Sequence, residues 1–176
     1  IVEELHDIKT IWEPSGKATH KGFQTDINMN LFANPSVKVA HLKSIIVEEL
    51  DSYYFKFRNK SCTYIQKWPT EKNLFGWHVI LKHQGHQTAH FHPSGWLSGV
   101  IYLKVVPSLG KEEGAIEFSL DGKNYSNVNS PKLTYQPESG DIVFFPSSLH
   151  HRTIPFTTDT DRISVSFDLM PEAAKK

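Results

Sequence analysis

DIVFFPSSLHHRTIPFTTDTDRISVSFDL, residues 141–169, holds three short runs rich in aromatic and β-branched residues, at 141–146, 151–156 and 162–169. Polar, turn-forming residues separate the runs, which is the pattern of short strands in an antiparallel sheet. Five runs of the same kind precede them, at 77–82, 88–92, 96–106, 115–120 and 132–135. Eight short strands predict a β-sandwich or barrel, and a double-sheet jelly roll of the cupin type fits this count.

A single long helix is expected before these strands. Between residues 37 and 57 the apolar side chains recur three and four positions apart, which is typical of an amphipathic helix that lies against a sheet. The first thirty-odd residues contain scattered proline and glycine and are expected to form loop with an edge strand. The predicted fold is therefore mainly β. Within one domain, 1–176, residues 1–70 supply helix and loop support and 75–170 the jelly-roll core.

Composition limits the classes of partner. Nineteen basic and nineteen acidic side chains cancel, so no long-range field attracts a nucleic acid or an anionic membrane. Cys62 is the only cysteine, and no apolar run approaches the roughly 20 residues that span a bilayer. We expect no nucleic-acid or membrane partner and a reducing, cytoplasmic location. Because the chain starts at Ile1, we also expect it to be part of a longer protein.

His90 and His92 form the most informative chemical pattern. Two imidazoles at positions i and i+2 of an extended segment share a side, so they can bind one metal ion with a third imidazole from the distant His151. Ten histidines in this length give about 0.6 such pairs by chance, so the spacing alone is not specific. The usual non-haem iron set has a carboxylate where His92 stands. His92 is therefore either a third ligand or stands aside while water completes the site.

Three other histidines compete for this role. His83 and His86 lie in a segment, 82–87, that is expected to be a solvated turn. His150 and His151 are neighbours on a predicted strand, so their side chains face opposite ways and only one of them can reach an interior metal. The alternation alone does not say which.

Arg162 and Ser164 open the last predicted strand and share one of its faces. A guanidinium offers two parallel donors to a carboxylate, and a hydroxyl adds a third hydrogen bond. This pair suits the far end of a dicarboxylic acid. The alternative is a structural ion pair between Arg162 and Asp159 or Asp161 at the surface.

Three segments together resemble a known family: HFHPSGWLSGVIYL at 90–103, GDIVFFPSSLHHRTIPF at 140–156 and RISVSFD at 162–168. They are similar to the 2-oxoglutarate/Fe(II) oxygenases often found at the C-terminus of tetratricopeptide-repeat proteins, over residues 75–170. The resemblance implies a double-stranded β-helix and iron bound by His90 and His151, with His92 at the carboxylate position. It also implies 2-oxoglutarate held by Arg162 with Ser164, O₂ as the oxidant, and the second histidine of the 150–151 pair as the distal ligand.

The expected function is that of an Fe(II)- and 2-oxoglutarate-dependent dioxygenase, a hydroxylase acting on a peptide or protein side chain. The peptide substrate is suggested by the repeats beside which such domains occur, since these commonly bind peptides. Two other classes stay open at this point. One is a three-histidine metalloenzyme, either a zinc hydrolase or a cupin dioxygenase, and the other is a non-enzymatic jelly-roll binding module.

Overall fold

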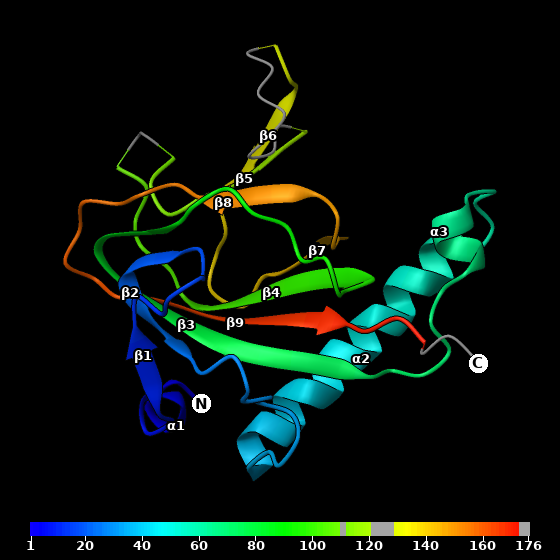
Figure 1. Ribbon diagram of the computed structural model, residues 1–176, viewed down its shortest axis with the longest axis horizontal. Coiled ribbons are helices and arrows are strands. Elements are labelled where there is room, and N and C mark those ends of the chain that lie inside the picture. Colours follow the sequence, from blue (N-terminus) through cyan, green and yellow to red (C-terminus); the bar gives the residue numbers. More distant parts are fainter. Residues whose placement is uncertain (110–111, 121–128, 173–176) are drawn as a thin grey trace.

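The computed structural model describes residues 1–109, 112–120 and 129–172, which form two β-sheets and three helices (Figure 1). The helices are α1 (Val2–His6), α2 (Val37–Phe57) and α3 (Thr63–Gln66). The strands are β1 (Thr10–Trp12), β2 (Thr19–Thr25), β3 (Leu74–Gln87), β4 (Leu97–Lys104), β5 (Ile116–Ser119), β6 (Lys132–Tyr135), β7 (Ile142–Pro146), β8 (His150–Thr153) and β9 (Arg162–Leu169).

The six-stranded sheet has the order β1-β2-β3-β9-β4-β7, and the three-stranded sheet has the order β6-β5-β8. All of their pairings are antiparallel. The apolar side chains between the two sheets include Val100, Ile116, Phe118 and Phe145. This arrangement confirms the predicted mainly β jelly roll with one helical segment packed on the sheet.

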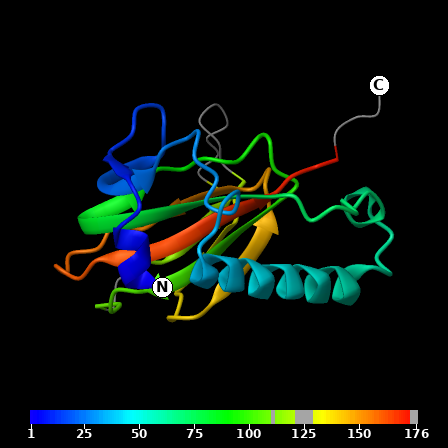
Figure 2. The same cartoon turned by 90° about the horizontal axis from the view of Figure 1, so that it is seen from below.

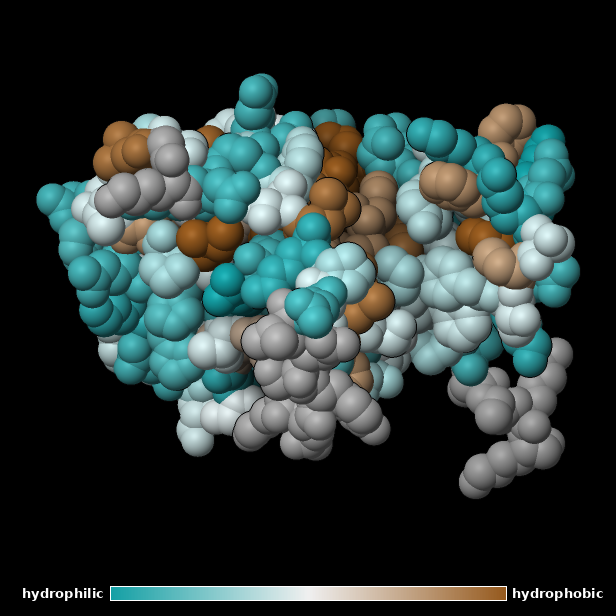
Figure 3. All heavy atoms as spheres, turned by 90° about the horizontal axis from the view of Figure 1, so that it is seen from above, coloured by the Kyte–Doolittle hydropathy of each residue, from teal (hydrophilic) through white to brown (hydrophobic). Residues whose placement is uncertain are grey.

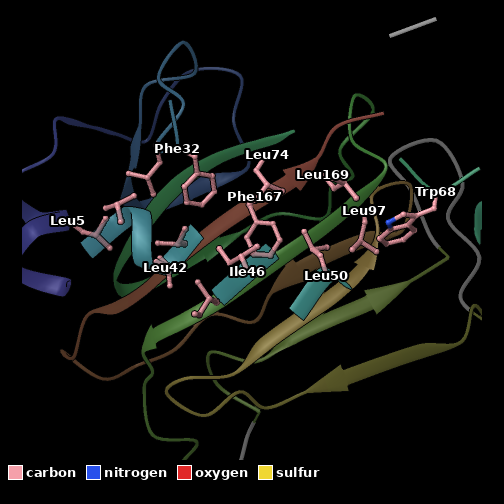
Figure 4. Close-up of a cluster of buried hydrophobic side chains, with 14 of the residues drawn as sticks. Leu5, Phe32, Leu42, Ile46, Leu50, Trp68, Leu74, Leu97, Phe167 and Leu169 are labelled. Atoms are coloured by element: carbon pink, nitrogen blue, oxygen red, sulfur yellow. The ribbon is translucent and has the colours of Figure 1, made fainter. Parts of the chain in front are cut away.

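Helix α2 covers the outer face of the larger sheet (Figure 2). The Ser36 side chain caps its N-terminus by accepting a hydrogen bond from the Val39 backbone N–H at 3.2 Å. One face of the helix, made by Val39, Leu42, Ile46 and Leu50, is buried. It packs on side chains of β3, β4 and β9 in the largest apolar cluster of the described chain (Figure 4). The prediction of an amphipathic helix over 37–57 is confirmed at both ends.

Strand β9 lies between β3 and β4, and all eight of its residues are buried. Its side chains alternate between two environments, as the period of a strand requires. Val165, Phe167 and Leu169 belong to the apolar cluster under α2. The residues of the opposite face are all polar and line cavities: Arg162, Ser164, Ser166 and Asp168. One strand therefore serves both the hydrophobic core and the polar interior of the jelly roll.

Glycine lies beside Phe167 on both neighbouring strands. Phe167 pairs in register with Gly76 of β3 and Gly99 of β4. A Cβ atom on Gly99 would lie 2.3 Å from the Phe167 ring, and one on Gly76 would lie equally close to the ring of Phe32. The two glycines thus make room for aromatic rings that tie the sheet to α2 and to the segment that precedes it.

The main differences between the structure and the prediction lie in three places. Strands β1 and β2 occupy residues that were expected to be mostly loop. The prediction missed β2 because the strand buries polar side chains: Thr19 and Gln24 hydrogen-bond each other at 2.8 Å, so the sequence shows no apolar alternation. The expected turn at 82–87 is wrong, since β3 continues to Gln87 through a residue of positive φ, Gln84. The expected strand at 88–92 forms only one bridge, between His90 and His151.

The surface seen from above is hydrophilic over most of its area, with hydrophobic residues in smaller patches (Figure 3). Among the described residues, no helix combines the length and apolar character needed to cross a membrane.

His78 is a fully buried histidine on β3, outside the cavities between the sheets. Neither of its ring nitrogens has a hydrogen-bond partner within the described part of the chain. Burial, reinforced by His6 of α1, lowers the pKa of His78 to about 4 from an ordinary value of 6.5. The His78 ring of the folded protein therefore binds a proton less readily than the same ring does in the unfolded chain.

We expect His78 to make the metal-free protein labile in acid. Between pH 6.5 and about 4 the unfolded state binds the extra proton, so the contribution of His78 to stability falls as the pH is lowered through this window and is constant below it. The pKa difference corresponds to about 3 kcal/mol. Denaturant unfolding across the window should show a shallower pH dependence in His78→Leu. The exposed His41→Gln is the control, and an unchanged slope in His78→Leu would contradict the expectation.

Candidate metal centre

His90, His92 and His151 surround one point in the interior, and their candidate ligand atoms all lie within 4.8 Å of one another. Backbone hydrogen bonds hold the segments that carry these histidines close together. The N–H of His90 donates to the carbonyl of His151 at 3.0 Å, and the reverse bond is 2.9 Å long. The N–H of His92 donates to the carbonyl of Ser147 at 2.8 Å. The segment before β4 is thus tied to the start of β8, so all three rings are brought together.

Each of the three rings has an acceptor at its Nδ1 atom. Nδ1 of His90 lies 2.7 Å from the Thr88 carbonyl, and Nδ1 of His151 lies 3.0 Å from the Leu149 carbonyl. Nδ1 of His92 lies 2.7 Å from Oδ1 of Asp168. A carbonyl or carboxylate oxygen can only accept, so each Nδ1 carries the proton and each Nε2 keeps its lone pair. This tautomer leaves Nε2 of each ring free to bind a metal ion.

The electrostatics of the site keep the imidazoles of His90 and His151 neutral. Burial lowers the pKa of His90 to about 4, against the opposing hydrogen bond to the Thr88 carbonyl. Burial, with His90 close by, lowers the pKa of His151 to about 3. Near neutral pH these rings hold no proton that a metal must displace. Three convergent nitrogen lone pairs fit a divalent first-row metal such as Fe(II).

Arg162 lies in the same interior, 2% exposed. Its Nε–H donates to the carbonyl of Gly114 at 3.0 Å, and its Cζ lies 4.8 Å from the centre of the Tyr102 ring. Burial lowers the pKa of Arg162 and raises that of Tyr102, while each of the two side chains opposes the other's shift. An arginine nevertheless stays charged in proteins.

No acidic side chain among the described residues forms an ion pair with Arg162. The alternative partners considered from the sequence are engaged elsewhere, since Asp161 pairs with Lys82 at 2.6 Å and Asp159 lies 3.4 Å from His83. A buried cation without an anion is costly. The lack of an acidic partner among the described residues therefore favours an anionic ligand.

A small cavity joins the predicted site residues. Its lining includes the three histidines, Arg162 and Ser164, together with Tyr102 and Ser166. The structure thus brings together all five side chains that the sequence singled out. A second, larger cleft of about 510 Å³ lies beside it, and the two share Trp77, Gln87, His90 and His92 as walls. A molecule in the larger cleft would therefore lie next to the histidines.

The competing histidines lie outside the small cavity. The His150 ring packs against Phe91, with ring centres 4.9 Å apart. His83 is exposed next to Asp159, and His86 stacks on His20 with ring centres 5.3 Å apart. The alternation at 150–151 therefore turns His151 inward and His150 toward the rim.

Sequence reasoning missed Asp168, whose carboxylate contacts His92. It also missed Ser147, a fully buried neighbour of that contact. A signal for Asp168 was present, because it lies on the same face of β9 as Arg162 and Ser164 by the simple period of two. Nothing comparable marked Ser147, which is placed by the turn between β7 and β8.

The family profile described as "Putative 2OG-Fe(II) oxygenase" matches residues 76–168, more than half of the 176 residues. A comparison with curated proteins finds no match.

Solved structures of low sequence identity share the fold. A Pseudomonas putida prolyl-4-hydroxylase has a TM-score of 0.64 at 10% identity, with 98% of this chain and 82% of that chain covered. HygX from Streptomyces hygroscopicus, with nickel, 2-oxoglutarate and hygromycin B bound, gives 0.59 at 14% identity, with 97% and 76% covered. An oxidoreductase of the 2OG-Fe(II) oxygenase family from Burkholderia pseudomallei gives 0.55 at 12% identity, with 99% and 80% covered.

The family match decides between the reaction classes left open by the sequence, in favour of the oxygenase over a zinc hydrolase or a binding module. With the fold and the three-histidine cluster, it shows that the chain belongs to the 2OG-Fe(II) oxygenases, enzymes that depend on Fe(II), 2-oxoglutarate and O₂.

Proposed function

We propose that His90, His92 and His151 hold the iron, that Arg162 and Ser164 hold 2-oxoglutarate, and that the enzyme hydroxylates a peptide or protein side chain. One observation carries the site assignment: the three histidines line the same small cavity as a buried arginine that has no acidic partner among the described residues. When bound, Fe(II) would supply the chemistry that activates O₂, one atom of which converts 2-oxoglutarate to succinate and CO₂ while the other hydroxylates a substrate C–H bond.

The protein's own contribution is to position and to exclude water. In this proposal the Arg162 guanidinium donates to the distal carboxylate of the cosubstrate, and Ser164, which lines the same cavity, adds its hydroxyl. Trp77 lies edge-on to His92, with ring centres 5.3 Å apart, and forms part of the wall between the cavity and the cleft. This apolar wall keeps bulk water from the side on which the histidines converge.

The larger cleft is our proposed substrate site. Aromatic side chains, Phe75, Trp77 and Phe91, share its lining with polar ones such as Gln24 and Gln87. Such a mixed lining suits an extended peptide, whose side chains are partly apolar and whose backbone needs hydrogen-bond partners. One protein of the same fold is a prolyl-4-hydroxylase, and a prolyl side chain is a substrate of this class.

Substrate-coupled succinate formation tests this assignment. The purified protein, loaded with Fe(II), is assayed with peptide, nucleic-acid and small-metabolite libraries under one set of conditions. We expect succinate above the uncoupled background with peptides alone, together with a peptide mass increase of one oxygen atom. Activity confined to metabolites or nucleic acid would overturn the peptide assignment and leave the oxygenase assignment intact.

A substitution at Ile27 tests whether the peptide binds in the cleft. Ile27 lines the cleft and is 60% exposed, so a bound peptide can cover it without any change to the fold. Ile27→Asp is expected to raise KM for the peptide about tenfold, because apolar contact is lost and a charge is desolvated. Val37→Asp changes an equally apolar, 88% exposed residue that does not line the cleft and is the control. Equal KM values for the two variants would place the peptide elsewhere.

A further inference from the structure

Asp168 stands directly behind His92. Its Oδ1 atom lies 2.7 Å from Nδ1 of His92 and 2.6 Å from the Ser98 hydroxyl. The Ser98 and Ser147 hydroxyls lie 2.8 Å apart. Ser98 and Ser147 are fully buried, and Asp168 is 8% exposed. Four side chains thus form one hydrogen-bonded group away from bulk solvent.

The proton positions in this group follow from its chemistry. A carboxylate only accepts, so both the His92 Nδ1–H and the Ser98 hydroxyl donate to Asp168. Because the single hydroxyl proton of Ser98 is donated to Asp168, the hydrogen bond between the two serines takes its proton from Ser147. With two donors on one carboxylate oxygen, Nδ1 of His92 is held protonated, and its Nε2 lone pair is aimed at the other two histidines.

The backbone leaves room for this group through Gly95. A Cβ atom at Gly95 would lie 2.5 Å from the Ser147 hydroxyl oxygen and 3.0 Å from the Asp168 carboxyl carbon. The Gly95 N–H also donates to the His92 carbonyl at 3.3 Å. The short turn after His92 is therefore built around the carboxylate.

His92 differs from its two partners in the charge of its acceptor. His90 and His151 donate to backbone carbonyls, whereas His92 donates to a carboxylate. A negative charge behind an imidazole makes the opposite nitrogen a stronger electron donor to a metal. An imidazole ligand brings no charge of its own to a divalent cation, and among the residues described Asp168 is the carboxylate that contacts one of these three rings.

We propose that Asp168 is a positioning residue that fixes the tautomer of His92 and supplies, through the imidazole, the negative charge that a directly bound carboxylate gives to the usual iron site. The inference rests on the proposed metal site at His90, His92 and His151. Asp168 acts through His92 and is not itself one of the three clustered ligands.

The first test needs no metal. Two-bond ¹⁵N–¹H correlation spectra of the metal-free protein report which nitrogen of each histidine carries the proton. In the wild type we expect His92 to be protonated at Nδ1. In Asp168→Ala a substantial population protonated at Nε2 should appear, while Asp168→Asn, which keeps an acceptor oxygen, should retain the wild-type tautomer. A wild-type His92 protonated at Nε2 would overturn the proposal.

The second test measures Co²⁺ affinity by calorimetry. Asp168→Asn keeps the shape of the side chain and removes its charge, so Co²⁺ binding should weaken about tenfold, and Asp168→Ala should weaken it about 100-fold. Asp159→Asn is the matched control, because it removes a carboxylate next to another histidine, the exposed His83. It is expected to leave the affinity unchanged.

The outcomes separate this inference from the proposed function. If the wild type binds Co²⁺ no better than His151→Ala does, the metal site itself is wrongly placed. If the wild type binds tightly through these histidines and both Asp168 variants bind within twofold of it, the site stands and the role of Asp168 is overturned. Asp168→Asn keeps the question open to test even if the alanine variant fails to fold.

Discussion

Replacing His151 by alanine is expected to weaken Fe(II) binding by more than about 100-fold, because one of three convergent nitrogen ligands is lost. The backbone hydrogen bonds between His90 and His151 do not involve the side chains, so the fold around the site should persist. Anaerobic titration of the metal-free protein with Fe(II), alongside a circular-dichroism check of folding, measures the effect. His90→Ala should behave in the same way.

His150→Ala is the matched control for this expectation. It removes an imidazole one position away, from a ring that packs on Phe91 outside the small cavity. Its affinity for Fe(II) should stay within about threefold of the wild type, as expected for a residue with no metal contact. Retained binding in His151→Ala with loss in His150→Ala would show that the distal ligand has been assigned to the wrong member of the pair.

The second large effect concerns Arg162. Arg162→Ala should weaken 2-oxoglutarate binding by about 100-fold or more, because the distal carboxylate would enter a buried cavity with no cation to meet it. Arg162→Lys keeps the charge but loses the planar pair of donors, and a loss of about tenfold is expected. Calorimetric titration of the metal-loaded protein gives the dissociation constants, and metal binding itself should persist in both variants.

Arg152 provides the control for Arg162. It forms a two-pronged ion pair with Glu117 between β8 and β5, with an exposed side chain, so Arg152→Ala removes a guanidinium of similar geometry from the surface. The affinity of the Arg152→Ala variant for 2-oxoglutarate should be the same as that of the wild type. As a further check, 2-oxobutyrate lacks the distal carboxylate and should bind the wild type and Arg162→Ala about equally. An unchanged constant for 2-oxoglutarate in Arg162→Ala would place the anchor elsewhere.

Strong local patterns predicted most of the fold. The three- and four-residue recurrence over 37–57 located α2, and the runs at 132–135 and 162–169 match β6 and β9 in full. The patterns failed where a strand buries polar residues or departs from regular strand geometry. Strand β2 buries Thr19 and Gln24 against each other, and β3 passes through Gln84 at positive φ, so neither shows the alternation that marks a strand.

The site was predictable in its residues but not in their surroundings. The residues themselves suggested a ligand set of His90, His92 and a distal histidine, and a carboxylate anchor at Arg162. The family resemblance then chose His151 over His150 and named 2-oxoglutarate as the anchored acid. Only the folded chain shows that Asp168, 76 positions after His92, lies behind its ring. Such a contact depends on the register between strands far apart in sequence. The expected placement beside tetratricopeptide repeats stays a prediction.

The two faces of β9 have a consequence for how this chain can change over evolution. Inserting or deleting one residue within the strand would turn every following side chain to the opposite face. Phe167 would enter the polar cavity, and Asp168 would enter the apolar layer beneath α2, so the core and the reactive centre would be lost together. Length variation is therefore confined to the connections on either side, and within β9 the chain can be altered only by exchanging one side chain for another.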